Sequence, residues 1–214
     1  MELRDLIEET IRESINYPIL FLPFFLISLL NNVFISNRVI SALGANWSLI
    51  ISLLFVVILV PIGNGITIVM DRGIVSGKGP NPPRALEITS SRSFLLIGIN
   101  FVAWMAAITG IFLLIVPGIY LYVKFIFVTQ EVLLGNADDF ETGLRSSWAR
   151  TTGHWSRLFA LLLVLEVPLL LLSLLAGQLP IGLAQTFQVI LSTVAQTWII
   201  LAFTHIYVRI SRGA

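Results

Sequence analysis

The sequence has 214 residues, but it contains no cysteine and few charged residues. Without cysteine, the chain can form no disulfide, no thiolate metal site and no thiol nucleophile. Asp, Glu, Lys and Arg make up 12% of the residues, whereas soluble domains contain about 25%. This shortage of charge excludes a soluble enzyme, a disordered regulator and a nucleic-acid-binding protein, because a water-facing surface of this size could not be covered.

The sequence contains several long apolar runs with few charged residues, and hydrophobic residues account for 57% of it. A membrane-spanning helix needs roughly 20 mostly apolar residues. The sequence predicts an all-α integral membrane protein, in which six transmembrane helices form three hairpins within one domain, residues 1–214. The expected spans are residues 18–35, 48–70, 94–116, 118–134, 158–176 and 182–207, with a turn at Pro117-Gly118 between the third and the fourth.

Positive charge lies on one side of this predicted topology, which places both termini in the cytoplasm of a multi-pass cell-membrane protein. The acidic residues before the first span argue against a signal peptide, so we expect that span to be retained. Eleven of the thirteen Lys and Arg residues fall on the cytoplasmic side: Arg4, Arg12, Arg72, Lys78, Arg84, Arg92, Arg145, Arg150, Arg157, Arg209 and Arg212.

A short segment of one pattern precedes each predicted hairpin, at residues 10–14, 85–89 and 143–147. In each segment a small residue is followed by an aliphatic residue, two variable positions and a residue with a hydroxyl group. We expect three amphipathic helices at the cytoplasmic interface and a weak internal repeat, although ordinary polar loops of a six-span protein would give a similar pattern. Asn81 before two prolines, and Asp138 with Glu141 three residues later, mark two helix starts.

The stretch from Ile115 to Lys124, together with Ser147-Trp148 and the segment 153–157, is similar to the membrane domain attached to some bacterial glycerophosphodiester phosphodiesterases. It also resembles related uncharacterised multi-span proteins of bacteria and archaea. The resemblance covers about residues 113–165, with Gly143 where the family usually has alanine. It implies an all-helical membrane module. It does not imply phosphodiesterase activity, which belongs to a separate soluble domain.

No catalytic or cofactor-binding motif emerges from the sequence. The glycine-rich segment 73–79 has three residues between its first two glycines, where a phosphate-binding P-loop needs four. Two histidines, His154 and His205, are too few to predict a metal site and are expected to anchor the chain at the membrane interface. We therefore expect no enzyme, no cofactor and no metal.

The sequence places Lys124 inside the fourth predicted span and Glu166 near the middle of the fifth. Helix geometry places them at similar depths, so they can form an intramembrane ion pair. Such a pair is either a proton or ion relay or a structural contact. Alternatively, Glu166 is protonated and the Lys124 side chain extends toward the interface.

Polar side chains also gather along one half of the sixth span, where lipid could not satisfy them. They either bond to neighbouring helices or line a polar cavity open to the outer side. The candidate cavity residues are Gln185, Gln188, Ser192, Thr193, Gln196 and Thr197.

Two functions remain open. The first is a non-enzymatic membrane module that binds lipid headgroups, or a membrane or cytoplasmic protein partner, at the cytoplasmic interface. Its candidate headgroup contacts are Arg92, Arg145, Arg150 and Arg157. The alternative is a small-solute or ion transporter or channel that uses the polar face of the sixth span. No nucleic-acid partner is expected.

Overall fold

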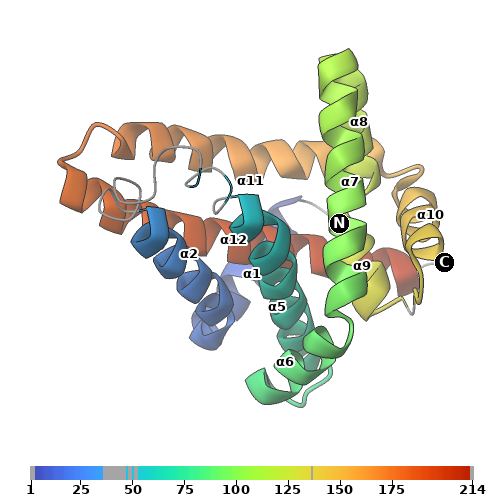
Figure 1. Ribbon diagram of the computed structural model, residues 1–214. Coiled ribbons are helices and arrows are strands. Elements are labelled where there is room, and N and C mark those ends of the chain that lie inside the picture. Colours follow the sequence, from blue (N-terminus) through green and yellow to red (C-terminus); the bar gives the residue numbers. More distant parts are fainter. Residues whose placement is uncertain (1–2, 36–46, 48–49, 51–52, 136, 213–214) are drawn as a thin grey trace.

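The computed structural model describes residues 3–35, 47, 50, 53–135 and 137–212, and all regular structure in these ranges is helical (Figure 1). The elements are α1 (Leu3–Asn16), the 3-10 helix η1 (Pro18–Phe21), α2 (Leu22–Ile35), the π-helical η2 (Phe55–Leu59), α5 (Val60–Val75), α6 (Pro82–Ser91), α7 (Ser93–Leu113), α8 (Ile115–Lys124), α9 (Val128–Leu133), α10 (Phe140–Thr151), α11 (Trp155–Ala176) and α12 (Ile181–Arg212).

Five helical segments in the described ranges are long and apolar enough to cross a membrane, which makes this a membrane protein. They are Phe55–Val75, Ser93–Leu113, Ile115–Leu133, Trp155–Ala176 and Ile181–Ser211. The all-helical prediction is therefore confirmed, whereas six spans in three hairpins stay a prediction. In Figure 1, α11 and α12 run side by side, and the α7–α8 pair crosses them near one end.

The first predicted span differs most from the sequence prediction. Residues 18–35 form η1 followed by α2, and this segment reaches span length only together with α1. The two parts, Arg4–Asn16 and Pro18–Asn32, meet at a bend of 97°. Pro18 starts the new helix, where its missing N–H is tolerated. Part of the second predicted span, residues 48–49 and 51–52, lies outside the described residues.

The junction between the third and fourth predicted spans lies at Leu114, whose backbone is extended at φ −160° and ψ 136°. The prediction of a turn at Pro117-Gly118 is therefore wrong by three residues. Pro117 lies in the first turn of α8, where its nitrogen would have no intrahelical acceptor in any case. Gly118 instead lets α7 and α8 touch, because a Cβ there would lie 2.4 Å from the backbone nitrogen of Ile111.

The fourth predicted span also contains a break. α8 ends at Lys124, a short irregular turn follows, and α9 continues from Val128 to Leu133. The residues of α9 from Val128 to Val132 are all buried, because the helix packs against α5, α7 and α10. Two of them, Gln130 and Glu131, are polar, so neighbouring helices must supply hydrogen-bond partners for these two side chains.

The three short helices expected before the hairpins are present as α1, α6 and α10. Within the repeated pattern, the small and the hydroxyl positions are buried in each helix: Thr10 and Ser14, Ala85 and Thr89, Gly143 and Ser147. The internal repeat and the membrane-interface location stay predictions.

Helix caps explain where two of these helices begin. The Asn81 side chain accepts a hydrogen bond from the Arg84 amide at the start of α6, as predicted. α10 starts one residue later than expected, with Asp139 as its cap in place of Asp138. The bond from the Thr142 amide lowers the pKa of Asp139 below its ordinary value.

The second half of α12 forms the centre of the core. Leu201 packs in one buried cluster with Leu20 and Met70. Phe203 belongs to a larger cluster, whose residues come from α1, α8, α11 and α12. The first third of the same helix is mostly exposed. The packed part of the molecule therefore surrounds residues 193–207, and the α11–α12 turn extends away from it (Figure 1).

The α7–α8 contact gives a direct test. Gly118→Ala should lower the free energy of unfolding in detergent by about 1–3 kcal/mol, because the new methyl group overlaps Ile111. Gly182→Ala in α12 is the matched control, since a Cβ there meets nothing within 4 Å. Equal stability of the two variants in a denaturation series would contradict the close packing.

Candidate functional site

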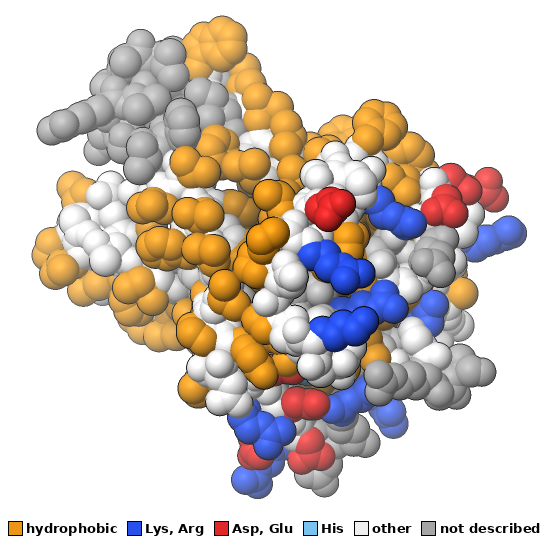
Figure 2. Space-filling model, turned by 90° about the horizontal axis from the view of Figure 1, so that it is seen from below, with side chains coloured by type: hydrophobic (Ala, Val, Ile, Leu, Met, Phe, Trp, Pro, Cys, Tyr) orange, Lys and Arg blue, Asp and Glu red, His pale blue; other side chains and the backbone are white. Residues whose placement is uncertain are grey.

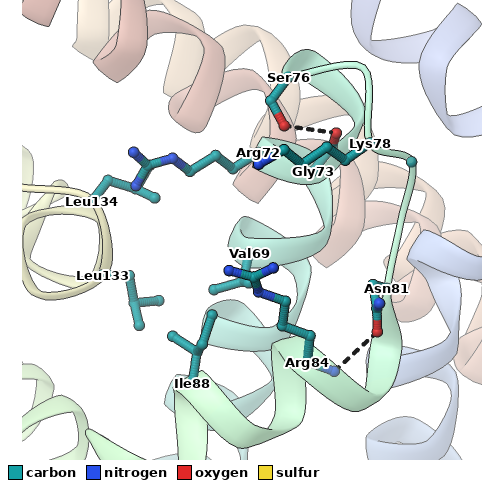
Figure 3. Close-up of a pocket in the computed structure, with 11 residues that line it drawn as sticks. Val69, Arg72, Gly73, Ser76, Lys78, Asn81, Arg84, Ile88, Leu133 and Leu134 are labelled. Carbon is teal, nitrogen blue, oxygen red and sulfur yellow. Dashed lines mark hydrogen bonds between the residues drawn. The ribbon is translucent and has the colours of Figure 1, made fainter.

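A pocket with several basic side chains opens where α5, α6 and α9 meet (Figure 3). Its volume is about 490 Å³, and it is named here the basic pocket. Arg72, Lys78 and Arg84 supply its cations, and all three are exposed. One wall is apolar and consists of Val69, Ile88, Leu133 and Leu134. In Figure 3 the Arg72 and Arg84 side chains reach into the space bounded by this wall.

The turn between α5 and α6 builds the pocket. Gly77 and Gly79 adopt positive φ angles of 74° and 73°, which residues other than glycine rarely adopt. The amide of Lys78 donates to the carbonyl of Gly73 over 2.9 Å and closes the turn. Asn81 then starts α6 and directs Arg84 back toward the end of α5. The glycine-rich segment 73–79, which lacks the spacing of a P-loop, thus brings Arg72, Lys78 and Arg84 to one opening.

Within the ranges that the structure describes, Arg72, Lys78 and Arg84 form no ion pair with a carboxylate. Figure 2 shows Lys and Arg side chains gathered on one part of the face seen there, with some Asp and Glu, beside a broad hydrophobic area. Three cations around one opening with an apolar wall form a place where an anionic group can bind.

The four arginines predicted to contact headgroups divide into two kinds. Arg92 donates to the carbonyl of Val132 over 2.5 Å and pairs with Asp138 at 3.5 Å. Arg150 is also bound internally, as described below. Arg145 and Arg157 are exposed, and neither forms an ion pair in the described part of the chain. The structure therefore leaves two of the four free to meet a ligand.

Arg150 belongs to a network around the buried carboxylate of Glu131. Its Nε lies 2.5 Å from Glu131 Oε1, and Tyr207 donates a hydrogen bond to Oε2 over 3.2 Å. The Arg150 guanidinium also stacks over the Tyr207 ring at 4.6 Å and donates to Ser211. Burial acts to lower the pKa of Arg150, but the bond and the charge of Glu131 outweigh it and raise the pKa. This network joins α9, α10 and α12.

Lys124 and Glu166 do not form an ion pair. Lys124 is buried and donates to the Thr152 hydroxyl over 2.8 Å, with its ammonium 4.9 Å from the Trp148 ring centroid and 5.5 Å from that of Tyr120. Trp148 lies in α10 and Thr152 directly follows it, whereas Tyr120 lies in α8 one turn before Lys124. Glu166 lies elsewhere, on a cavity between the long helices.

That second cavity has a volume of about 380 Å³ and lies among α5, α7, α8, α9, α11 and α12. We name it the inner cavity. Its polar lining residues are Asn64, Asn100, Tyr122, Thr129, Gln130, Glu166 and Gln196. Asn100 and Thr129 hydrogen-bond to each other, whereas the buried Oε1 of Gln130 has no partner. Gln196 is the one member of the predicted α12 cavity set that reaches this lining.

The other polar residues of that set lie elsewhere. Gln188 bonds to Ser173 of α11, and Ser192 bonds to Ser28 of α2 at 2.9 Å. Thr193 and Thr197 are buried and donate to carbonyls one turn earlier. A hollow of about 370 Å³ is lined by several of these and by polar residues of α2: Gln185, Gln188, Ser192, Ser28, Asn31 and Asn32. Both interhelical bonding and a polar hollow are thus present on this face.

Besides the Glu131 network, sequence reasoning missed two further groupings. The basic pocket could have been found from the density of Gly, Arg and Lys in residues 72–84. We used these basic residues to orient the chain in the membrane, and we compared the glycines with a P-loop. The second is a buried cluster of Glu13, Asp71 and His205, from α1, α5 and α12. A lone aspartate near the end of an apolar run was the available signal for it. His205 is buried within the bundle at 5% exposure, so the prediction of an interface anchor is wrong.

Comparison with known proteins places the chain in one family. A family model described as a domain of unknown function, DUF7847, matches residues 85–210. The match covers more than half of the chain, so the protein belongs to this family. No curated protein and no solved structure gives a significant match. Nothing here links the chain to the membrane domain of glycerophosphodiester phosphodiesterases, so that resemblance stays a prediction.

The Glu131 network predicts unequal effects for two arginines of α10. Arg150→Met should cost about 3–5 kcal/mol of stability in detergent, because it leaves the Glu131 carboxylate buried without its partner. Arg145→Met should change stability by no more than about 0.5 kcal/mol, because Arg145 is exposed. Adding Glu131→Gln to Arg150→Met should recover part of the loss. Additive losses in this double mutant would reject the pairing.

Proposed function

We propose that this protein is a non-enzymatic, multi-pass membrane module that binds the phosphate of anionic lipid headgroups in the basic pocket. The observation that carries the proposal is the set of Arg72, Lys78 and Arg84 around one opening, without a carboxylate partner in the described residues. Guanidinium groups bind phosphate oxygens through paired hydrogen bonds, and lysine adds a point charge.

The apolar wall of the basic pocket supports a lipid over a soluble anion. Val69, Ile88, Leu133 and Leu134 face the same space as the two guanidinium groups. A free phosphate ion would gain nothing from such a wall, whereas the glycerol and upper acyl carbons of a lipid would be buried against it. Basic residues near a membrane surface are attracted to anionic lipid by about 1 kcal/mol each.

The charge distribution supports a cytoplasmic position for this pocket. Residues 72–84 contain three of the basic residues that the sequence places on the cytoplasmic side, together with both termini. Arg145 and Arg157 are exposed without ion pairs and would add to the attraction on the same side. Arg92 and Arg150 have internal partners, so their role in the proposal is to hold helices together.

Lipid binding tests the proposal in purified, detergent-solubilised protein. Arg72→Gln with Arg84→Gln should weaken binding of phosphatidylglycerol about 30-fold, since two contacts of about 1 kcal/mol each are lost and 1.4 kcal/mol is tenfold. The measurements are lipid adducts in native mass spectrometry and the thermal shift on adding lipid. Sodium chloride should weaken wild-type binding.

Three comparisons keep the test specific. Arg145→Gln with Arg157→Gln removes the same charge outside the pocket and should have the smaller effect. Phosphatidylcholine should bind no better to wild type than to the pocket variant. Inorganic phosphate that stabilises the protein as strongly as the lipid would point to a soluble anion. An unchanged affinity of the pocket variant would reject the proposal.

The inner cavity favours a second candidate, a transporter or channel for a small solute or ion. Six helices contribute to its lining, and Glu166 and Gln130 are polar groups that an apolar environment could not satisfy. A water-filled cavity of this kind is a usual place for intramembrane carboxylates.

Cysteine labelling tests the inner cavity directly, because the chain has no cysteine of its own. In cells, single cysteines at Asn100 and Gln196 should react with small aqueous thiol reagents if the cavity holds water. A cysteine at Leu201 is the control, because that side chain is fully buried in the core. Protection of all three positions in folded protein would remove the reason to consider transport.

A further inference from the structure

The buried cluster of Glu13, Asp71 and His205 lies apart from both cavities. The Nε2 atom of His205 is 2.7 Å from Oε2 of Glu13 and 3.3 Å from Oδ1 of Asp71. Side-chain exposures are 17% for Glu13, 1% for Asp71 and 5% for His205. Three ligand-type atoms, all within 4.8 Å of one another, thus come from the helices α1, α5 and α12.

Hydrogen bonds alone leave this cluster incomplete. The single Nε2 of His205 faces two carboxylates, and its hydrogen bond is to Asp71. Glu13 Oε2 is fully buried and has no hydrogen bond, although it lies close to the same nitrogen. The other ring nitrogen, Nδ1, is also buried without a partner. The Glu13 oxygen is therefore a buried ligand-type atom without a hydrogen bond, which a bound ion would provide with a partner.

Charge balance also favours a cation at this cluster. Two ionised carboxylates bring a charge of about −2 into a buried place. A divalent cation would neutralise the group and give the Glu13 oxygen a partner. No other Lys or Arg forms an ion pair with Glu13 or Asp71 in the described residues. Apart from His205, the described residues therefore offer these two carboxylates no cationic partner.

The spacing of the three atoms suits a first-row transition metal. One imidazole nitrogen with two carboxylate oxygens is a donor set for Zn²⁺ or Mn²⁺. Tetrahedral ligands at about 2.0–2.1 Å from zinc lie about 3.3 Å from one another. The 3.3 Å separation between His205 and Asp71 matches this value, whereas the Glu13 oxygen, at 2.7 Å from His205, would have to move outward to admit an ion.

We propose that Glu13, Asp71 and His205 form a structural binding site for a divalent transition-metal ion, which joins the first helix of the chain to α5 and α12. The site does not depend on lipid binding in the basic pocket. The metal would stabilise the fold by binding the folded chain and not the unfolded one.

Metal content and thermal stability test the site. The full-length protein should be purified through a peptide tag that does not bind metal, then analysed by inductively coupled plasma mass spectrometry. About one equivalent of zinc or manganese per chain is expected. Treatment with EDTA should lower the melting temperature by several degrees, and added Zn²⁺ should restore it. Co²⁺ should give the visible absorption of a nitrogen–oxygen site.

Matched variants locate the ion. His205→Ala and Glu13→Gln should lose the bound metal and the response to EDTA and Zn²⁺. His154→Ala removes the one other histidine and should keep both, as should Glu8→Gln on the exposed side of α1. Should His205→Ala fail to fold, calorimetric titration of EDTA-treated wild type with Zn²⁺ decides. Absence of saturable binding there, or equal metal content in wild type and a folded His205→Ala protein, would overturn the proposal.

Discussion

Polar groups along α12 must find partners within the protein, because neither lipid nor an apolar core can replace the hydrogen bonds of water. The first half of α12 contains Gln188 and Ser192, and its last turns contain His205, Tyr207 and Arg209. Each of these five side chains contacts a side chain of another helix. The cross-helix partners are Ser173 of α11, Ser28 of α2, Ser14, Glu9 and Glu13 of α1, Asp71 of α5, Glu131 of α9 and Arg150 of α10. The order of helices around α12 thus follows from its polar side chains.

Local signals in the sequence predicted the elements well. Long apolar runs indicated an all-helical membrane protein, and Asn81 with two prolines marked the start of α6. Such signals act within a few residues, so they survive in any tertiary context. The errors arose where packing chose between equivalent local options. The break between α7 and α8 falls at Leu114, four residues before Gly118. Gly118 thereby lies within α8, where it packs closely against Ile111 of α7.

The site was less predictable, because its residues are distant in sequence. Helix rise alone fixed the depth of Lys124 and Glu166 but not the direction in which each side chain points. Thr152 and the Trp148 ring, both distant in sequence, contact Lys124 together with Tyr120 of the same helix, and only Tyr120 lies at a spacing that the sequence shows. Glu13 and His205 are likewise brought together only by the packing of α1 on α12. The basic pocket is the exception, since all three of its cations come from one short segment.

The contact between the first and the last helix has a consequence for biosynthesis. Trp198 donates to Ser14 across 184 positions, and Arg209 binds Glu9 across 200. At about 5–20 residues per second, α1 leaves the ribosome roughly 10–40 s before its partners on α12 exist. During that interval Leu6, fully buried in the finished fold, has no core to enter. Until α12 has been made, α1 therefore lacks the helix on which it packs in the finished fold.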